Sequence, residues 1–230
     1  MDKEDSRMTK MLKIAGNSQF YPDSPSYLDE ELRWVRTRVS RILAERQLQG
    51  AMEEETDGDP AYTHRPGRLD SRELRCRVFE LKETEKKLRN EINARLDLNR
   101  TQRGAPPLGL DEICKEFDLS AEERIVLVTC LPLAISQRVA EMTLGEMLHH
   151  WGSIAVSDLV AVLDPQGLGD WLRYRALFRP HSPLISHGLV TLGKPGGEVQ
   201  PSTLMCSDVS LSLDCFARMV GDPDTMTEAD

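Results

Sequence analysis

Two stretches in the first half of the chain have hydrophobic residues at every third or fourth position. This spacing puts apolar side chains along one face of a helix and is typical of the seam between paired helices. Only Glu85 interrupts the second seam with a polar side chain. The pattern therefore predicts two long helices that need partners. The seam residues are Leu28, Leu32, Val35, Val39 and Ile42 in the first stretch, and Leu74, Val78, Leu81, Leu88, Ile92 and Leu96 in the second.

Segments without this periodicity flank the two helices. Residues 50–70 combine glycines and prolines with the acidic run Glu53–Glu55, which predicts a disordered acidic loop where the chain reverses. Residues 1–26 are expected to form a flexible leader, with Ser26 capping the first helix. Residues 27–103 are thus predicted to form an antiparallel hairpin of long helices. The alternative is that each helix packs separately on the C-terminal domain.

The sequence Gly104-Ala-Pro-Pro107 ends the second helix, since proline cannot continue it, and places a domain boundary near residue 104. Several short helices are expected beyond it. Ser120 and Glu123 form a capping-box signature for one of them, and Ser157 is expected to cap another. Pro132 is expected to end or bend the helix that contains it. The expected helices cover residues 111–117, 121–131, 143–151, 157–163, 169–178 and 213–220.

After Pro183 the hydrophobic period shortens toward two, which favours strands. Short strands are expected near residues 184–185, 189–192 and 202–212, with a glycine-rich turn at 193–197. The predicted fold is therefore mainly α: an antiparallel long-helix hairpin followed by a winged-helix-like α+β domain. That domain covers residues 104–222 and has a small two- to three-stranded wing, and 223–230 form a polar tail.

Two segments carry a resemblance to a known family. They are LDEICKEFDLSAEER at 110–124 and PLISHGLVTL at 183–192, preceded by a helical stretch rich in Leu, Arg and Glu. In this order they resemble the winged-helix domain that precedes the ATPase module in a group of bacterial AAA+ ATPases. The resemblance covers about residues 70–220. The chain departs from the family at residues 132–136, where an acidic Pro-Glu-Leu-Asp stretch is common.

The resemblance implies a regulatory or partner-recruiting module whose ATPase module would follow Asp230. ATP and magnesium would be bound only there. A phosphate-binding loop needs Gly-x4-Gly-Lys-Ser/Thr, whereas the nearest stretch, Leu192–Gly197, has a proline after its lysine and no hydroxyl. We therefore expect no cofactor in this chain, which is either an N-terminal part of such an ATPase or a stand-alone relative.

The distribution of charge bears on the partner. The chain has a net charge of −9, and residues 104–230 hold eight basic and 18 acidic residues, a net of −10. Binding to nucleic acid requires clustered positive charge, so the winged-helix-like domain is expected to bind protein instead. Residues 68–103 hold 11 basic and seven acidic residues, a net of +4. A DNA-binding transcription regulator that acts through residues 70–103 is the alternative function.

Four residues are candidates for partner binding. Arg72 and Arg75 near the start of the second long helix could attract an acidic partner, although interleaved Glu and Lys usually form a solvated, ion-paired face. Trp151 and Tyr174 are the aromatic interface candidates. The neighbouring aromatics Trp171 and Phe178 are instead expected in the core. Self-association through the hairpin is a further expectation.

No residue pattern points to catalysis or to metal binding. The five cysteines lack a Cys-x-x-Cys pair, and His149 and His150 would point to different sides of a helix. The histidines have no nucleophile motif around them. We expect no signal peptide, because residues 1–16 lack the apolar core of one, and no apolar run approaches membrane-spanning length. We therefore expect a non-catalytic cytoplasmic protein without membrane insertion.

Overall fold

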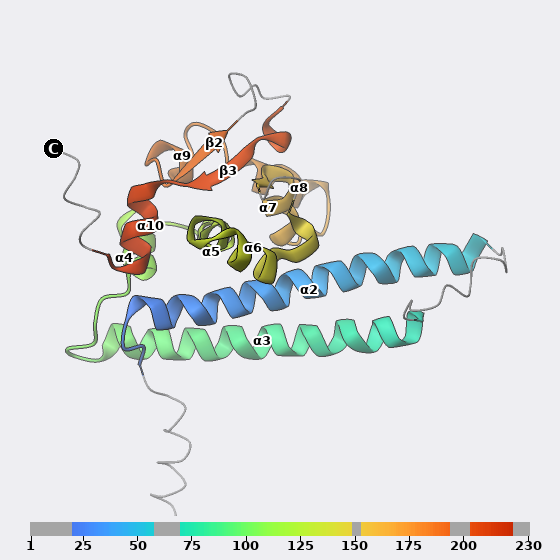
Figure 1. Cartoon of the computed structure of the whole chain (residues 1–230), viewed down its shortest axis with the longest axis horizontal. Helices are drawn as coiled ribbons and strands as arrows, with labels where there is room; N and C mark the ends of the chain where they lie inside the picture. Colours follow the sequence, from blue (N-terminus) through green and yellow to red (C-terminus); the bar gives the residue numbers. More distant parts are fainter. Residues whose placement is uncertain (1–19, 58–69, 149–152, 194–202, 223–230) are drawn as a thin grey trace, which may run out of the picture.

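The long-helix hairpin predicted from the two seams is present in the computed structural model, which describes residues 20–57, 70–148, 153–193 and 203–222. Helix α2 spans Ser24–Asp57 and helix α3 spans Ser71–Thr101. They run antiparallel along one side of the molecule (Figure 1). Their apolar seams meet, since the seam residues of α3 from Leu74 to Leu96 are buried except for the half-buried Leu81.

The start of α2 differs from the prediction. The helix begins at Ser24, and the backbone N–H of Ser26 donates to the Asp23 carboxylate at 2.7 Å, so Asp23 caps the helix in place of Ser26. Tyr21 is fully buried, and its backbone N–H donates to Asn99 of α3 at 2.6 Å. The expectation of a flexible leader is therefore wrong for residues 20–26, while residues 1–19 lie outside the described residues.

The predicted loop also begins later than expected. Helix α2 continues through Gly50 to Asp57, so the part of the loop predicted at 50–57 is wrong. A glycine inside a helix costs only about 1 kcal/mol relative to alanine. The residues that precede it pack against α3, so Gly50 does not end the helix. The remainder of the predicted acidic loop, 58–69, lies outside the described residues.

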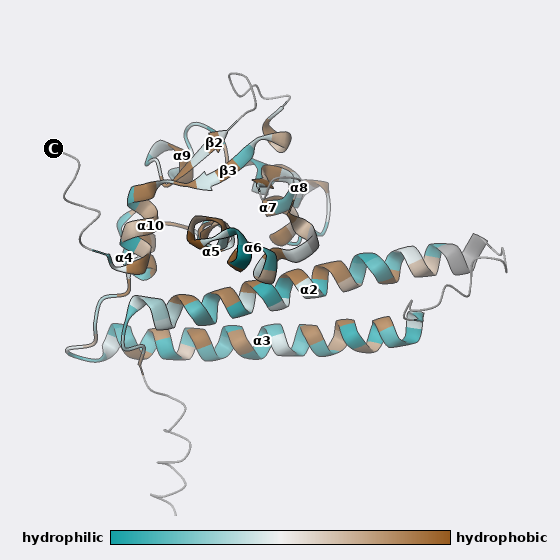
Figure 2. Cartoon of the chain, viewed as in Figure 1, coloured by the Kyte–Doolittle hydropathy of each residue, from teal (hydrophilic) through white to brown (hydrophobic). Residues whose placement is uncertain are grey.

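The C-terminal domain is formed by short helices around a small sheet. The capping box predicted at Ser120 and Glu123 is present at the start of the longest of these helices. That helix is largely hydrophobic and lies at the centre of the domain (Figure 2). The helices are α4 (Gly109–Glu116), α5 (Ala121–Ile135), α6 (Gln137–Leu144), α7 (Val156–Val162), α8 (Leu168–Ala176), α9 (Pro183–Ser186) and α10 (Leu213–Val220).

Three short strands form an antiparallel sheet in the order β1-β3-β2. Strand β1 is Ile154–Ala155, β2 is Val190–Gly193 and β3 is Asp208–Leu211. In the register, Val209 of β3 lies opposite Ile154 on one side and Leu192 on the other. Short helices followed by a small wing were predicted, so the predicted fold class is confirmed, although strand β1 was not among the expected strands.

Local details of this domain correct several expectations. Residues 184–185 lie in α9 and not in a strand, because Pro183 occupies the first turn of a helix, where proline is favoured. Ser157 does not cap α7, which begins at Val156; there Asp158 accepts from the backbone N–H of Ala155 at 2.9 Å. Pro132 lies inside α5, which continues to Ile135.

The helix expected over 143–151 is confirmed at residues 143–144 and is wrong at residues 145–148. Helix α6 covers Gln137–Leu144, and Gly145 follows it with a positive φ of 53°, a conformation that side-chain-bearing residues rarely adopt. A single 3-10 turn, Gly145–Met147, comes next. Residues 149–152 lie outside the described residues.

Candidate functional site

Helices α7 and α8 form a helix–turn–helix pair beside the small sheet (Figure 1). The turn after α7 leads directly into α8. In this turn the backbone N–H of Gln166 donates to the carboxylate of Asp170 in α8 at 3.0 Å. In helix–turn–helix DNA-binding proteins, the second helix of such a pair enters the major groove and reads base edges. Helix α8 is the second helix of this pair, so its outward side chains bear on the function.

The outward face of α8 is apolar. Leu168 is 75% exposed, Trp171 38% and Leu172 53%. Residues three and four apart on a helix are neighbours on its surface, so these three side chains form one patch, which we call the α8 patch. Exposed aromatic and large aliphatic side chains that lie together are typical of protein-docking surfaces.

The opposite face of α8 holds the residues that fix the helix to the domain. Tyr174 is 8% exposed, and Phe178, just beyond the helix, is 1% exposed. The structure thus corrects the sequence analysis on two aromatics, because Tyr174 is buried and Trp171 is exposed. The placement of Phe178 in the core is confirmed. Trp151, the other aromatic candidate, lies outside the described residues.

Charged residues at the edge of the α8 patch are mostly paired with each other. The Arg173 guanidinium lies 3.5 Å from the Asp170 carboxylate and 3.6 Å from that of Glu122 on α5. It also donates to the Tyr174 hydroxyl at 2.9 Å. A guanidinium with these partners contributes less net positive charge to the surface than a free one. The apolar side chains therefore dominate the character of this helix.

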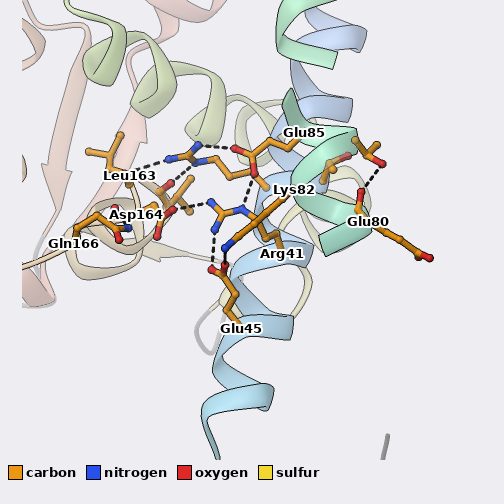
Figure 3. Close-up of polar contacts among 12 residues, drawn as sticks. Arg41, Glu45, Glu80, Lys82, Glu85, Leu163, Asp164 and Gln166 are labelled. Atoms are coloured by element: carbon orange, nitrogen blue, oxygen red, sulfur yellow. Dashed lines mark hydrogen bonds and ion pairs between the residues drawn. The ribbon is translucent and has the colours of Figure 1, made fainter. Parts of the chain in front are cut away.

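A second feature lies where the hairpin meets the C-terminal domain. Glu85, the polar residue in the α3 seam, accepts hydrogen bonds from Arg38 and Arg41 of α2, each at 2.6 Å. Arg41 also donates to Asp164 at 2.8 Å and to Glu45 at 2.7 Å (Figure 3). We call these five residues the Glu85 cluster.

The Glu85 cluster fixes the end of α7 to the hairpin. The Arg38 guanidinium donates to the carbonyl oxygens of Val162 at 2.6 Å and Leu163 at 3.2 Å. A cation at the last carbonyls of a helix satisfies groups that the helix leaves unpaired and interacts favourably with its dipole. Asp164, which has a left-handed φ of 61°, places its carboxylate toward Arg41. The turn that precedes α8 is therefore held by α2 and α3.

A smaller buried cluster joins α2, α3 and α5. Glu31 of α2 is 1% exposed and pairs with Arg89 of α3 and with Arg124 of α5. Tyr27 is fully buried beside them, and burial, with the Glu31 charge next, raises the pKa of its hydroxyl well above its ordinary value. The pairing of a buried carboxylate with two guanidiniums offsets the cost of removing these charges from water.

Within the described ranges, no three His, Cys, Asp or Glu side chains are grouped so as to hold a metal ion. All five cysteines are free thiols. None of the described helices combines the length and the apolar character needed to span a bilayer. The remaining predicted residues, Arg72 and Arg75, are both exposed on α3.

Comparisons with known proteins bear on the family. A family model described as "Winged helix domain, variant" matches residues 12–228, which covers both the hairpin and the C-terminal domain. No curated protein and no solved structure matches the chain.

The sequence alone did not locate the α8 patch, because apolar residues occur on both faces of this helix. The spacing of these residues was the signal that could have indicated the patch.

Proposed function

Because the chain belongs to the variant winged-helix-domain family, we propose that it is a non-catalytic module that recruits or regulates a protein partner through the α8 patch. The observation that carries this proposal is the exposure of Leu168, Trp171 and Leu172 on the helix that would otherwise read DNA. A helix that reads base edges needs side chains able to form hydrogen bonds in the major groove. Leu168 and Leu172 cannot form them.

Charge supports the same proposal. Residues 104–230 have a net charge of −10, and phosphate contacts supply most of the affinity of proteins for DNA. A domain with this charge repels a duplex unless a local cationic patch compensates. In α8 the Arg173 guanidinium already faces Asp170 and Glu122. A protein surface with exposed apolar side chains is a better partner for the α8 patch.

We further propose that the partner system is an AAA+ ATPase. The two segments at 110–124 and 183–192 that resemble the winged-helix domain of bacterial AAA+ ATPases support this part of the proposal, and the family match is consistent with it. ATP and magnesium would be bound by the ATPase module and not by this chain. The module would then act in the cytoplasm, where it brings a substrate or regulator to the ATPase.

The test is affinity capture with matched surface variants. The double variant L168D/L172D places two charges in the α8 patch, while L213D changes a leucine that is 72% exposed at the start of α10. We expect the wild-type chain and L213D to capture an AAA+ ATPase, identified by mass spectrometry. L168D/L172D should reduce its recovery about tenfold, because buried hot-spot leucines contribute over 1 kcal/mol each. Equal recovery by both variants, or the absence of any AAA+ ATPase, would refute the proposal.

The alternative function is a DNA-binding transcription regulator, and the helix–turn–helix pair α7–α8 is the observation in its favour. It predicts a mobility shift of duplex DNA that weakens steeply as salt rises, because counterions are released when phosphates are contacted. A protein-recruiting module predicts no shift at low salt. A salt-dependent shift that R173E abolishes would favour the DNA-binding function.

A further inference from the structure

One flank of α3 carries cations at regular helical spacing with an exposed phenylalanine among them. Arg72, Arg75, Phe79, Lys82 and Lys86 follow each other at intervals of three, four, three and four residues. On a helix with 3.6 residues per turn, this spacing keeps all five side chains on one flank over about 21 Å. We call this set the α3 stripe.

The α3 stripe lies beside the buried seam and not opposite it. The seam residues precede the stripe residues by one position in several turns, as Val78 precedes Phe79 and Glu85 precedes Lys86. Consecutive residues are about 100° apart around a helix, so the stripe borders the line where α3 meets α2. A third helix placed on the stripe would contact the hairpin along this line.

Most of these cations lack an internal partner. Lys82 pairs with Glu45 of α2 at 2.8 Å. Among the described residues, no carboxylate lies within ion-pair distance of Arg72, Arg75 or Lys86, and all three side chains are exposed. The ion-paired face expected from the interleaved Glu and Lys residues is therefore not what the α3 stripe presents. The Lys87–Glu91 pair, for instance, lies on a different side of the helix.

Phe79 gives the stripe an apolar anchor point. Its side chain is 66% exposed, so most of it lies outside the contact between α2 and α3. An exposed aromatic side chain between cations matches a partner surface that combines apolar and acidic side chains. A purely polar ligand would leave Phe79 in water and gain nothing from it.

The stripe continues into a groove of about 860 Å³ between the hairpin and the turn before α8. Lys82 and Lys86 line the groove on the α3 side, Met52 lines it on the α2 side, and Gln166 closes it beside the Glu85 cluster. The volume of the groove is sufficient for several side chains of a helix that lies on the stripe. Its rim is positive on the α3 side and apolar at Met52.

We propose that the α3 stripe and this groove bind an acidic amphipathic helix of a partner protein. Acidic side chains at intervals of three and four residues would face Arg72, Arg75 and Lys86, and an apolar residue would cover Phe79. A protein helix is the occupant that fits, because it can cover the exposed Phe79 with an apolar side chain while its carboxylates face the cations of the α3 stripe. The site is separate from the α8 patch and does not depend on its function.

The test uses a fluorescein-labelled synthetic peptide of three heptads, (Glu-Ile-Ala-Glu-Leu-Ala-Ala)3, and the full chain. Fluorescence anisotropy should show that the peptide binds. The charge-reversal variant R72E/R75E/K86E should weaken this binding by roughly tenfold or more, because it replaces three exposed ion pairs with repulsion between like charges. F79A should weaken binding without changing its salt dependence. The same peptide with lysine in place of glutamate should not bind.

The matched control is R33E/R103E/R138E, which changes the net charge equally at exposed arginines outside the stripe. It should bind the acidic peptide nearly as well as the wild-type chain. Equal losses in both triple variants would overturn the proposal, because binding would then follow net charge alone. The proposal also fails if the wild-type chain binds duplex DNA of similar length more tightly than it binds the peptide. It fails as well if light scattering shows a dimer for the wild-type chain and a monomer for R72E/R75E/K86E. L168D/L172D should leave peptide binding unchanged.

Discussion

Replacing Glu85 by leucine tests the interpretation of the hairpin most sharply. By the seam pattern alone, leucine at this position completes the row of apolar side chains and should stabilise the helix pair. A buried leucine contributes about 1.5–3 kcal/mol relative to an exposed one. In the structure, however, Glu85 is the shared acceptor of Arg38 and Arg41. The two interpretations therefore predict effects of opposite sign.

The magnitude follows from the contacts. Glu85→Leu removes two charge-assisted hydrogen bonds of 2.6 Å, each contributing about 1.5–3 kcal/mol. Arg41 is only 5% exposed, so its charge stays buried, although Glu45 and Asp164 still face it. The gain from burying leucine partly offsets these losses. We expect a net decrease in the free energy of unfolding of about 2–3 kcal/mol, because the lost hydrogen bonds outweigh the gain from burying leucine.

The assay is thermal and urea unfolding followed by circular dichroism. For a chain of this size, the expected loss lowers Tm by roughly 4–12 °C. Glu83→Gln, at an exposed position on the same helix, is the control and should leave Tm nearly unchanged. The double variant Glu85→Leu/Arg41→Leu should recover part of the loss, since it removes the buried charge together with its partner. An unchanged or higher Tm for Glu85→Leu would refute the structural reasoning.

Three further predictions concern stability. Gly50→Ala should raise stability by up to about 1 kcal/mol, because the position is inside α2 with open space around it; a loss in urea unfolding would contradict the continuous helix. Gly109→Ala should unfold the domain or lower Tm sharply, because its Cβ would lie 1.9 Å from the Arg218 carbonyl oxygen; a wild-type Tm would contradict the close packing of α4 on α10. Burial raises the pKa of Cys114 to about 11 and that of Cys215 to about 12, from 9.0, so the unfolded chain loses these protons first. Stability should then fall as pH rises above 9, by roughly 1–2 kcal/mol per thiol near pH 10.5, and urea unfolding of a C114A/C215A variant should show a smaller fall.

The fold was predictable where local pattern decides it. The seam from Leu74 to Leu96 is buried as its spacing indicates, with Leu81 half-buried, and the capping box at Ser120 starts α5 at the predicted residue. The last helix was expected over 213–220 and spans Leu213–Val220. In each case the residues that determine the structure are within a few positions of each other, or repeat with one period.

Features that depend on distant residues could not be predicted. The role of Glu85 could not be predicted, because its partners are 44 and 47 residues away on α2. In the sequence it is only a polar interruption of the seam. Strand β1 has two residues and exists through its pairing with β3. In α8, Trp171 and Tyr174 have similar hydrophobic character, and only the packing of the whole domain decides which of them turns inward. The sequence therefore placed the exposed aromatic of this helix at Tyr174, whereas the structure exposes Trp171.

The same distinction applies to the charges. Counting residues showed a positive second helix, but counting cannot separate paired from free cations. Arg89 pairs with Glu31 and Arg100 with Asp111 within the molecule, whereas Arg72 is exposed with no described carboxylate within ion-pair distance. The geometry of the hairpin thus separates the cations that form ion pairs within the molecule from those that a partner can contact.

Site-specific photocrosslinking tests the central claim, that α8 docks a protein, most directly. A benzophenone amino acid is placed at position 172 in the α8 patch or at position 213 on α10, both exposed in the structure, and the cells that express the chain are irradiated. We predict a crosslink from position 172 to an AAA+ ATPase or its substrate, and none of that product from position 213. A crosslink from position 172 to DNA, or the same proteins from both positions, would contradict the account.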